Sequence, residues 1–174
     1  MTTQSNNTSP AAEQSPIDRA REIASKHLDP LAPYFLSIVR AACGFFLAAH
    51  GLAKIHNVER FTAALERKGF PAAAMFAWLA IFGELVCGTL LGLGAATRPA
   101  AAFCSITMFV AVLSSHLKDM ANIGGKGGSS FEYPMLLALV ALSFVFTGPG
   151  PAGVDAIVMA RNEDEPAPTP EPVK

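Results

Sequence analysis

The stretch LAPYFLSIVRAACGFFLAAHGLA, residues 31–53, is apolar around nearly its whole helical circumference and is long enough to cross a lipid bilayer. Similar runs follow at Phe70–Ala96, Pro99–Leu117 and Tyr133–Thr147. A soluble domain of this length would show a polar face along each helix. The four runs therefore predict membrane-spanning helices, although the last is short enough that a re-entrant or interfacial segment is the alternative.

The composition of the whole chain agrees with a membrane protein. Of its 174 residues, 51% are hydrophobic and only 16% are charged, and the net charge is −1. Polar ends dilute the apolar middle and lower the mean hydropathy to +0.36. The predicted fold class is all-α: a four-helix transmembrane bundle with short amphipathic surface helices. We expect the lipid bilayer as its surroundings and no nucleic-acid partner.

The chain divides into three predicted parts. Residues 1–30 are a polar extension in which Ser15 and Pro16 have the residue types of a helix cap and a first turn. A short amphipathic helix lying on the membrane surface is predicted there. Residues 31–156 form the membrane domain, and residues 157–174 form an acidic, Pro-rich tail that is expected to be unfolded.

Features of the termini bear on insertion and topology. The N-terminal extension lacks a short apolar segment followed by a cleavage site, so the first apolar run is expected to act as its own insertion signal. Four spans place both termini on the same side of the membrane. Basic residues flank the two sides about equally, so the positive-inside rule does not decide which side that is.

Two charged residues lie inside the apolar runs, Arg40 in the first and Glu84 in the second. A charge at the bilayer centre costs several kcal/mol unless it is paired, hydrated or used. Counting about 1.5 Å per residue from the expected helix ends places the two charges within about 5 Å in depth. We therefore predict an ion pair between them, which either fixes packing alone or belongs to a functional site.

Helical phase places each charge on a stripe of small residues. Small residues let membrane helices approach closely, and the spacing of Gly88 and Gly92 repeats the small-xxx-small pattern. The two stripes are therefore predicted to face each other. The stripe of the first run is Arg40, Gly44, Leu47, Gly51 and Lys54, and that of the second is Ala77, Ala80, Glu84, Gly88 and Leu91.

A second group of ionisable residues is predicted at the opposite mouth of the bundle. It contains His50, Lys54, His116, Glu132 and Tyr133. Histidine changes its charge near neutral pH, so this group could exchange protons with a quinone or a similar redox partner. The alternative is that these side chains only anchor the helix ends in the headgroup layer.

The cysteines and the glycine-rich loop predict less specific roles. Cys43, Cys87 and Cys104 each lie inside a span without a C-x-x-C pair, so packing is predicted, and a redox disulfide is the alternative. No metal site is expected. The loop IGGKGGSS, residues 123–130, lacks the phosphate-loop pattern and predicts a flexible hairpin. The amphipathic segment Asn57–Phe70 is predicted to lie on the membrane surface near the bundle mouth.

Several of these elements together resemble the DoxX family of small bacterial membrane proteins. The resemblance covers residues 33–156. In the loop it departs in detail, because Ser129, Ser130 and Phe131 separate the glycines from Glu132, where one aromatic residue is expected. The matching elements are Arg40, His50-Gly51-x-x-Lys54, Glu84, Thr97-Arg98, Gly127-Gly128 with Glu132-Tyr133-Pro134, and Thr147-Gly148-Pro149-Gly150 with Asp155.

This resemblance implies a four-helix bundle in the bacterial cytoplasmic (inner) membrane with both termini in the cytoplasm. It also implies redox chemistry, because the family takes its name from a subunit of a quinone-linked sulfur-oxidising enzyme, and other members resemble partners in oxidative-stress complexes. The chain has no haem, flavin or cysteine-pair motif. An electron carrier would therefore be a bound quinone or a soluble oxidoreductase partner.

Two functions follow as predictions. The first is a membrane subunit of a quinone- or thiol-linked redox system that binds a small apolar ligand within the bundle. The second is a non-enzymatic scaffold that recruits soluble partners through its loops and tails. A pathway for a small molecule or for protons is a weaker third prediction, and oligomer formation stays open.

Overall fold

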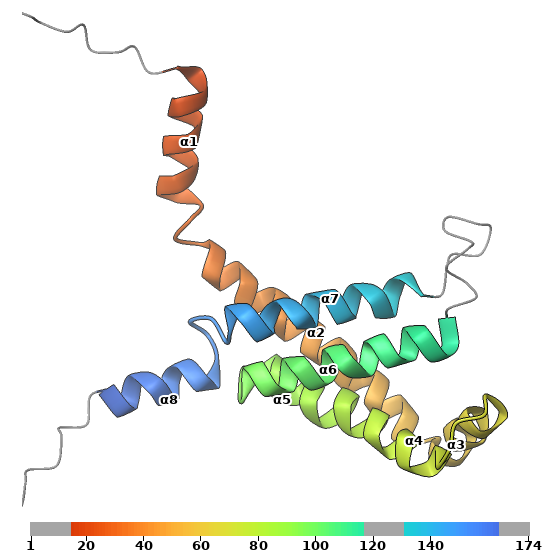
Figure 1. Ribbon diagram of the computed structural model, residues 1–174. Helices are drawn as coiled ribbons and strands as arrows, with labels where there is room; N and C mark the ends of the chain where they lie inside the picture. The colour runs from red at the N-terminus through yellow and green to blue at the C-terminus, as the bar shows by residue number, and fades with distance from the viewer. Residues whose placement is uncertain (1–14, 117–130, 164–174) are drawn as a thin grey trace, which may run out of the picture. The chain divides into compact units, whose positions relative to one another are not determined.

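The computed structural model of the protein describes residues 15–116 and 131–163, except for the side chains of residues 115, 116 and 163. Within these ranges every regular element is a helix, which confirms the predicted fold class (Figure 1). The elements are α1 (Pro16–His27), α2 (Ala32–Ile55), α3 (Val58–Arg67), α4 (Ala73–Ile81), η1 (Phe82–Cys87), α5 (Gly88–Leu93), α6 (Thr97–Ala111), η2 (Val112–His116), α7 (Glu132–Thr147) and α8 (Val154–Glu163).

The chain divides into two compact units between Pro33 and Tyr34. Helix α1 belongs to the first unit and begins where the sequence predicts. The backbone N–H of Asp18 donates to Ser15 Oγ at 3.2 Å, and the Ser15 hydroxyl donates to the Asp18 carboxylate at 2.7 Å. No residue of α1 is buried, so packing inside its own unit does not hold this helix, and its cap and first-turn proline define its start.

Three helical stretches of the chain are long and apolar enough to cross a membrane: Ala32–Ile55, Ala73–Leu93 and Thr97–Ser114. The second is one continuous run made of α4, η1 and α5. The fourth apolar helix, α7, has 16 residues and a length of about 24 Å. These four stretches are the predicted runs, and they build the membrane bundle.

Helix α2 and the second span pack backbone to backbone through glycines. A methyl group at Gly44 would lie 2.5 Å from the Gly92 Cα and 2.6 Å from the Gly88 carbonyl oxygen. One at Gly51 would lie 2.7 Å from the Leu85 Cβ. Only glycine permits this approach, as the small-residue stripes predict. The contacts also fix which residues of the two helices lie at the same level.

The main core of the bundle contains all three cysteines and joins α2, the second span, α6 and α7. Each cysteine is buried and free of any disulfide. The hydroxyl of Ser105 on α6 donates to the Ala138 carbonyl of α7 at 3.0 Å, which satisfies a polar group at this interface. The cysteines therefore pack as small apolar residues, as predicted.

A smaller core lies under the predicted amphipathic segment. Helix α3 lies inside that segment and buries Leu65 against Ala73 and Ala77 of α4. The aromatic rings of Phe61, Phe70 and Phe76 pack around this contact. The segment between the first two spans thus contains a helix, α3, that packs against α4.

Two features of the backbone depart from the sequence prediction. The second span contains a π-helical segment, η1, and the third ends in another, η2. Helix α8 extends to Glu163, so the first part of residues 157–174 is helical rather than unfolded. The rest of that tail and the loop 123–130 lie outside the described residues.

Candidate functional site

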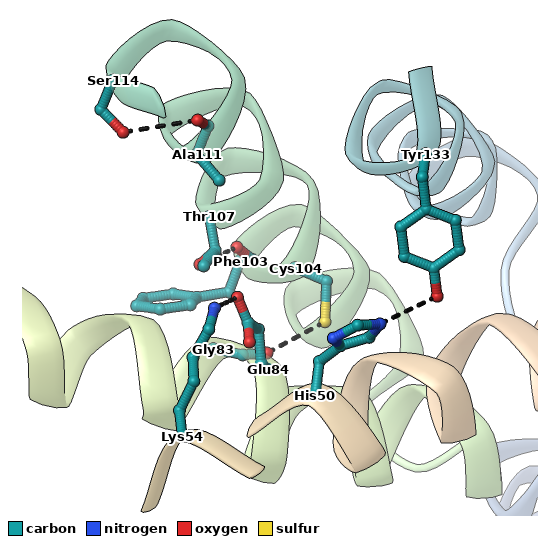
Figure 2. Close-up of polar contacts among 10 residues, drawn as sticks. All are labelled: His50, Lys54, Gly83, Glu84, Phe103, Cys104, Thr107, Ala111, Ser114 and Tyr133. Carbon is teal, nitrogen blue, oxygen red and sulfur yellow. Dashed lines mark hydrogen bonds and ion pairs between the residues drawn. The ribbon is translucent and has the colours of Figure 1, made fainter. Parts of the chain in front are cut away.

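Glu84 forms an ion pair with Lys54, not with Arg40 (Figure 2). The Glu84 side chain is 1% exposed, and its Oε1 atom accepts a hydrogen bond from Lys54 Nζ. Lys54 is 27% exposed and lies in the last turn of α2. The pair combines a residue predicted for the middle of the bundle with one predicted for its mouth.

Arg40 is buried, as predicted, but it binds backbone carbonyls instead of a carboxylate. Its Nη1 atom donates to Leu91 O at 2.5 Å and to Gly92 O at 2.8 Å. Its Nε atom donates to Pro149 O at 2.9 Å, and Nη2 donates to Ala152 O at 3.3 Å. The guanidinium therefore joins α2 to the C-terminal end of α5, where helix carbonyls favour a cation, and to the loop between α7 and α8.

The stagger of the two helices explains why the predicted ion pair is wrong. The prediction assumed that the start of α2, near Pro33, and the end of the second span, near Gly94, lie at the same depth. Arg40 lies eight residues inside α2 but is level with Leu91 and Gly92, at the very end of the second span. Glu84 lies seven residues before Leu91 in that span, which is about 10 Å along the helix axis. Lys54, beyond the Gly51–Leu85 contact, is the cation within reach.

Asp155 completes the polar contacts at the Arg40 end. The N–H groups of Ala96 and Thr97 and the Thr97 hydroxyl donate to its carboxylate, each at 2.8 Å. Asp155 thus caps α6 from another helix. Burial would raise the pKa of this carboxyl, but these hydrogen bonds and the charge of Arg40 outweigh it and hold the pKa below its usual 3.8.

The role of Asp155 is one that sequence reasoning missed. The signal was present in part, because Asp155 and Thr97 both belong to the elements that resemble the DoxX family. Nothing in their spacing shows that a carboxylate caps a helix that begins 58 residues earlier.

Glu84 lies in the π-helical segment η1, and its second oxygen lacks a partner. The Oε2 atom is buried and accepts no hydrogen bond from any described residue. An unpartnered buried acceptor is costly, and in a native protein it often marks a place for a ligand or water. Single π-helical turns inside α-helices also occur frequently at functional sites.

An apolar cavity of about 540 Å³ extends from this ion pair between α3, α4, η1 and α6. This volume is in the range typical of small-molecule sites. Its polar end contains Lys54 and Glu84. We call it the apolar cavity; the remaining lining residues are Phe61, Leu65, Lys68, Phe70, Phe76, Leu79, Ala80, Phe103, Ile106, Thr107, Val110, Ala111 and Ser114.

The predicted mouth cluster is brought together only in part. His50 Nε2 and the Tyr133 hydroxyl share a hydrogen bond of 3.1 Å, which joins α2 to α7 (Figure 2). Lys54 turns instead toward Glu84. Glu132 begins α7 and is exposed, and the side chain of His116 lies outside the described residues.

The described part of the chain holds no group of three or more His, Cys, Asp or Glu side chains that could bind a metal. The ion pair supplies both kinds of hydrogen-bonding group to the polar end of the cavity. The Lys54 ammonium can donate hydrogen bonds, and the two Glu84 oxygens can accept them. Together they can orient one polar group at the end of an otherwise apolar ligand.

Comparison with known proteins agrees with this architecture. The DoxX family model matches residues 35–117. An uncharacterized protein of Haemophilus influenzae is 30% identical over 131 residues, which cover 74% of this chain and 94% of that protein. The chain belongs to the DoxX family.

A second relative of this DoxX protein is an uncharacterized membrane protein of Mycobacterium tuberculosis. It is 32% identical over 133 residues, which cover 71% of this chain and 80% of the relative. No solved structure matches the chain. Membership of the family and the apolar helices establish a membrane protein with several spans.

Proposed function

We propose that this DoxX protein is the membrane subunit of a redox system and binds a quinone in the apolar cavity. The observation that carries the proposal is the unpartnered Glu84 Oε2 at the polar end of a cavity lined mainly by apolar side chains. A quinone has the matching shape, with a small polar ring and a long apolar tail. Few other membrane-soluble molecules combine these two parts with redox activity.

Each polar group of the pair has a role in this proposal. The Lys54 ammonium donates a hydrogen bond to a quinone carbonyl oxygen, and Glu84 Oε2 accepts one from a quinol hydroxyl. Hydrogen bonds to charged groups contribute about 1.5–3 kcal/mol. The ion pair therefore binds both the oxidised and the reduced ring, while the apolar lining binds the tail.

The remaining parts of the redox system are proposed from the family resemblance. Electrons come from a soluble oxidoreductase at the membrane surface, as the family resemblance implies. The protein lies in the bacterial inner membrane with both termini in the cytoplasm. His50 of α2 and Tyr133 of α7, which share a hydrogen bond, exchange protons with the surface.

Binding can be tested with the single tryptophan of the chain as a reporter. Trp78 lies on α4, the helix that supplies Phe76, Leu79 and Ala80 to the cavity. The detergent-purified protein is titrated with a short-chain benzoquinone while Trp78 fluorescence is recorded. Saturable quenching is expected, and Ala80→Phe, which fills the cavity, should weaken binding at least tenfold.

Two further variants separate cavity binding from partition into the micelle. Leu139→Phe adds a similar ring on α7, outside the cavity, and should bind the quinone normally. Glu84→Gln should weaken quinol binding about tenfold, equivalent to roughly 1.4 kcal/mol. Quenching that is linear with quinone concentration, or equal in the Ala80→Phe and Leu139→Phe variants, would contradict the proposal.

A further inference from the structure

A second, basic pocket lies on the other side of Lys54, between the end of α2 and the start of α3. Its volume is about 320 Å³. We call it the basic pocket; its lining residues are His50, Ala53, Lys54, Asn57, Arg60, Phe61 and Ala64. His50, Lys54 and Asn57 recur at helical spacing along α2 and its turn, and Arg60 faces them from α3.

The charge of this pocket favours an anion. The pocket contains two basic side chains, Lys54 and Arg60, and none of its seven lining residues is acidic. Arg60 is exposed and has no hydrogen bond or ion pair with any described residue. Its planar guanidinium offers paired N–H donors that match the oxygens of a phosphate.

Lys54 retains donors for such an anion. An ammonium group has three N–H donors, and the structure directs one of them to Glu84 Oε1. The Nζ atom also lies 5.0 Å from the centre of the Phe61 ring. Lys54 and Phe61 thus line both the basic pocket and the apolar cavity. A polar site and an apolar site meet at these two side chains.

The position of the pocket matches the headgroup layer of a membrane. The pocket lies where the first span ends at Ile55, and α3 packs its apolar side onto α4 through Leu65. Amphipathic helices of this kind lie at the boundary between headgroups and acyl chains. Arginine and lysine side chains bind phosphate oxygens through charge-assisted hydrogen bonds.

We propose that the basic pocket binds the phosphate of an anionic phospholipid headgroup, held by Arg60 and Lys54. A free phosphate ion offers the same oxygens, but the adjoining apolar cavity favours an amphiphile. The proposal goes beyond the quinone site: Lys54 lines both sites, but Arg60 lines only the basic pocket, so an Arg60 variant tests the lipid site separately.

The test uses the full-length protein in a neutral detergent with added phosphatidylglycerol or phosphatidylcholine. Native mass spectrometry records how many lipids stay bound. Arg60→Gln removes one cation from the pocket, and Arg67→Gln makes the same change on α3 outside both cavities. Circular dichroism checks that each variant is folded, and benzoquinone binding is measured separately. A parallel titration uses inorganic phosphate alone.

Wild-type protein and the Arg67→Gln variant should retain phosphatidylglycerol over phosphatidylcholine, and Arg60→Gln should lose about fivefold or more of that preference. Phosphate at 10 mM should not displace the lipid. Equal retention of both lipids, equal effects of the two arginine variants, or displacement by inorganic phosphate would each overturn the proposal. Quinone binding should be unchanged in Arg60→Gln, so a failed quinone site gives a different result.

Discussion

Glu84 pairs with Lys54 and not with Arg40, and double-mutant cycles on protein stability can test this assignment. Lys54→Met leaves the Glu84 carboxylate, 1% exposed, without its hydrogen-bond donor. Removing one partner of a buried ion pair typically costs about 3–5 kcal/mol. Glu84→Gln should cost less, about 1–2 kcal/mol, because the long Lys54 side chain can extend its ammonium toward the headgroup layer.

The double variant Lys54→Met/Glu84→Gln should therefore be more stable than the sum of the two single effects predicts. We expect a coupling of about 2–3 kcal/mol, within the range for residues in direct contact. The second cycle pairs Arg40→Gln with Glu84→Gln. These positions share no partner and are about 10 Å apart along the bundle, so their effects should add within about 0.5 kcal/mol.

Both cycles can be measured by reversible unfolding in mixed micelles of mild detergent and sodium dodecyl sulfate, with helical circular dichroism as the signal. Lys26→Met on α1 serves as the control, since it removes an exposed lysine that lines neither cavity. A coupling below about 0.5 kcal/mol for Lys54 and Glu84, or a larger one for Arg40 and Glu84, would refute the stagger of the helices described above.

Further predictions concern packing, pH and thiol reactivity. Gly44→Ala should destabilise the bundle by about 1–3 kcal/mol because the new methyl group meets backbone atoms of the second span; Gly92→Ala, whose nearest contact is Phe45 at 3.5 Å, should not. Asp155→Asn should lower the free energy of unfolding above pH 4, because the hydrogen bonds of Asp155 favour its ionised carboxylate. The loss should become smaller as the pH falls through the lowered pKa of Asp155. Unfolding curves between pH 7 and pH 2.5 measure this. The three buried cysteines should resist a water-soluble maleimide until the protein is unfolded, and rapid labelling of the folded protein, read by mass spectrometry, would contradict this.

The sequence predicts the helices well because each depends on local pattern. Length and apolar character locate the spans, and the cap at Ser15 locates α1. The stripe through Gly44 and Gly51 is also local, since helical period alone brings these residues to one face. Its prediction that the first two spans pack closely is confirmed by the glycine contacts.

The partners of the charged residues could not be predicted in the same way, because they depend on the stagger between helices. A shift of about one turn, roughly 5 Å, takes Arg40 out of reach of Glu84 and leaves Lys54 as its partner. No local pattern reports such a shift. The hydrogen bonds of Arg40 are also hidden from sequence, since backbone carbonyls of any residue type can accept them.

The π-helical segment at Glu84 and the cap of α6 by Asp155 are hidden for related reasons. A π turn changes the hydrogen-bond pattern of a helix without a distinctive composition. Asp155 replaces a local cap that the sequence does not supply, since Ala96 precedes α6 and has no side-chain acceptor. The cap by Asp155 arises from tertiary packing, which joins residues that are distant in the chain.

The acceptors of Arg40 have a consequence for the synthesis of the protein. Leu91 follows Arg40 by 51 residues, and Pro149 follows it by 109. At about 5–20 residues per second, a ribosome makes Pro149 about 5–20 s after Arg40. The Leu91 and Gly92 carbonyls exist after about half of that time, whereas those of Pro149 and Ala152 are made last. We therefore expect the nascent helix to keep part of its guanidinium hydrated until the last loop has been made.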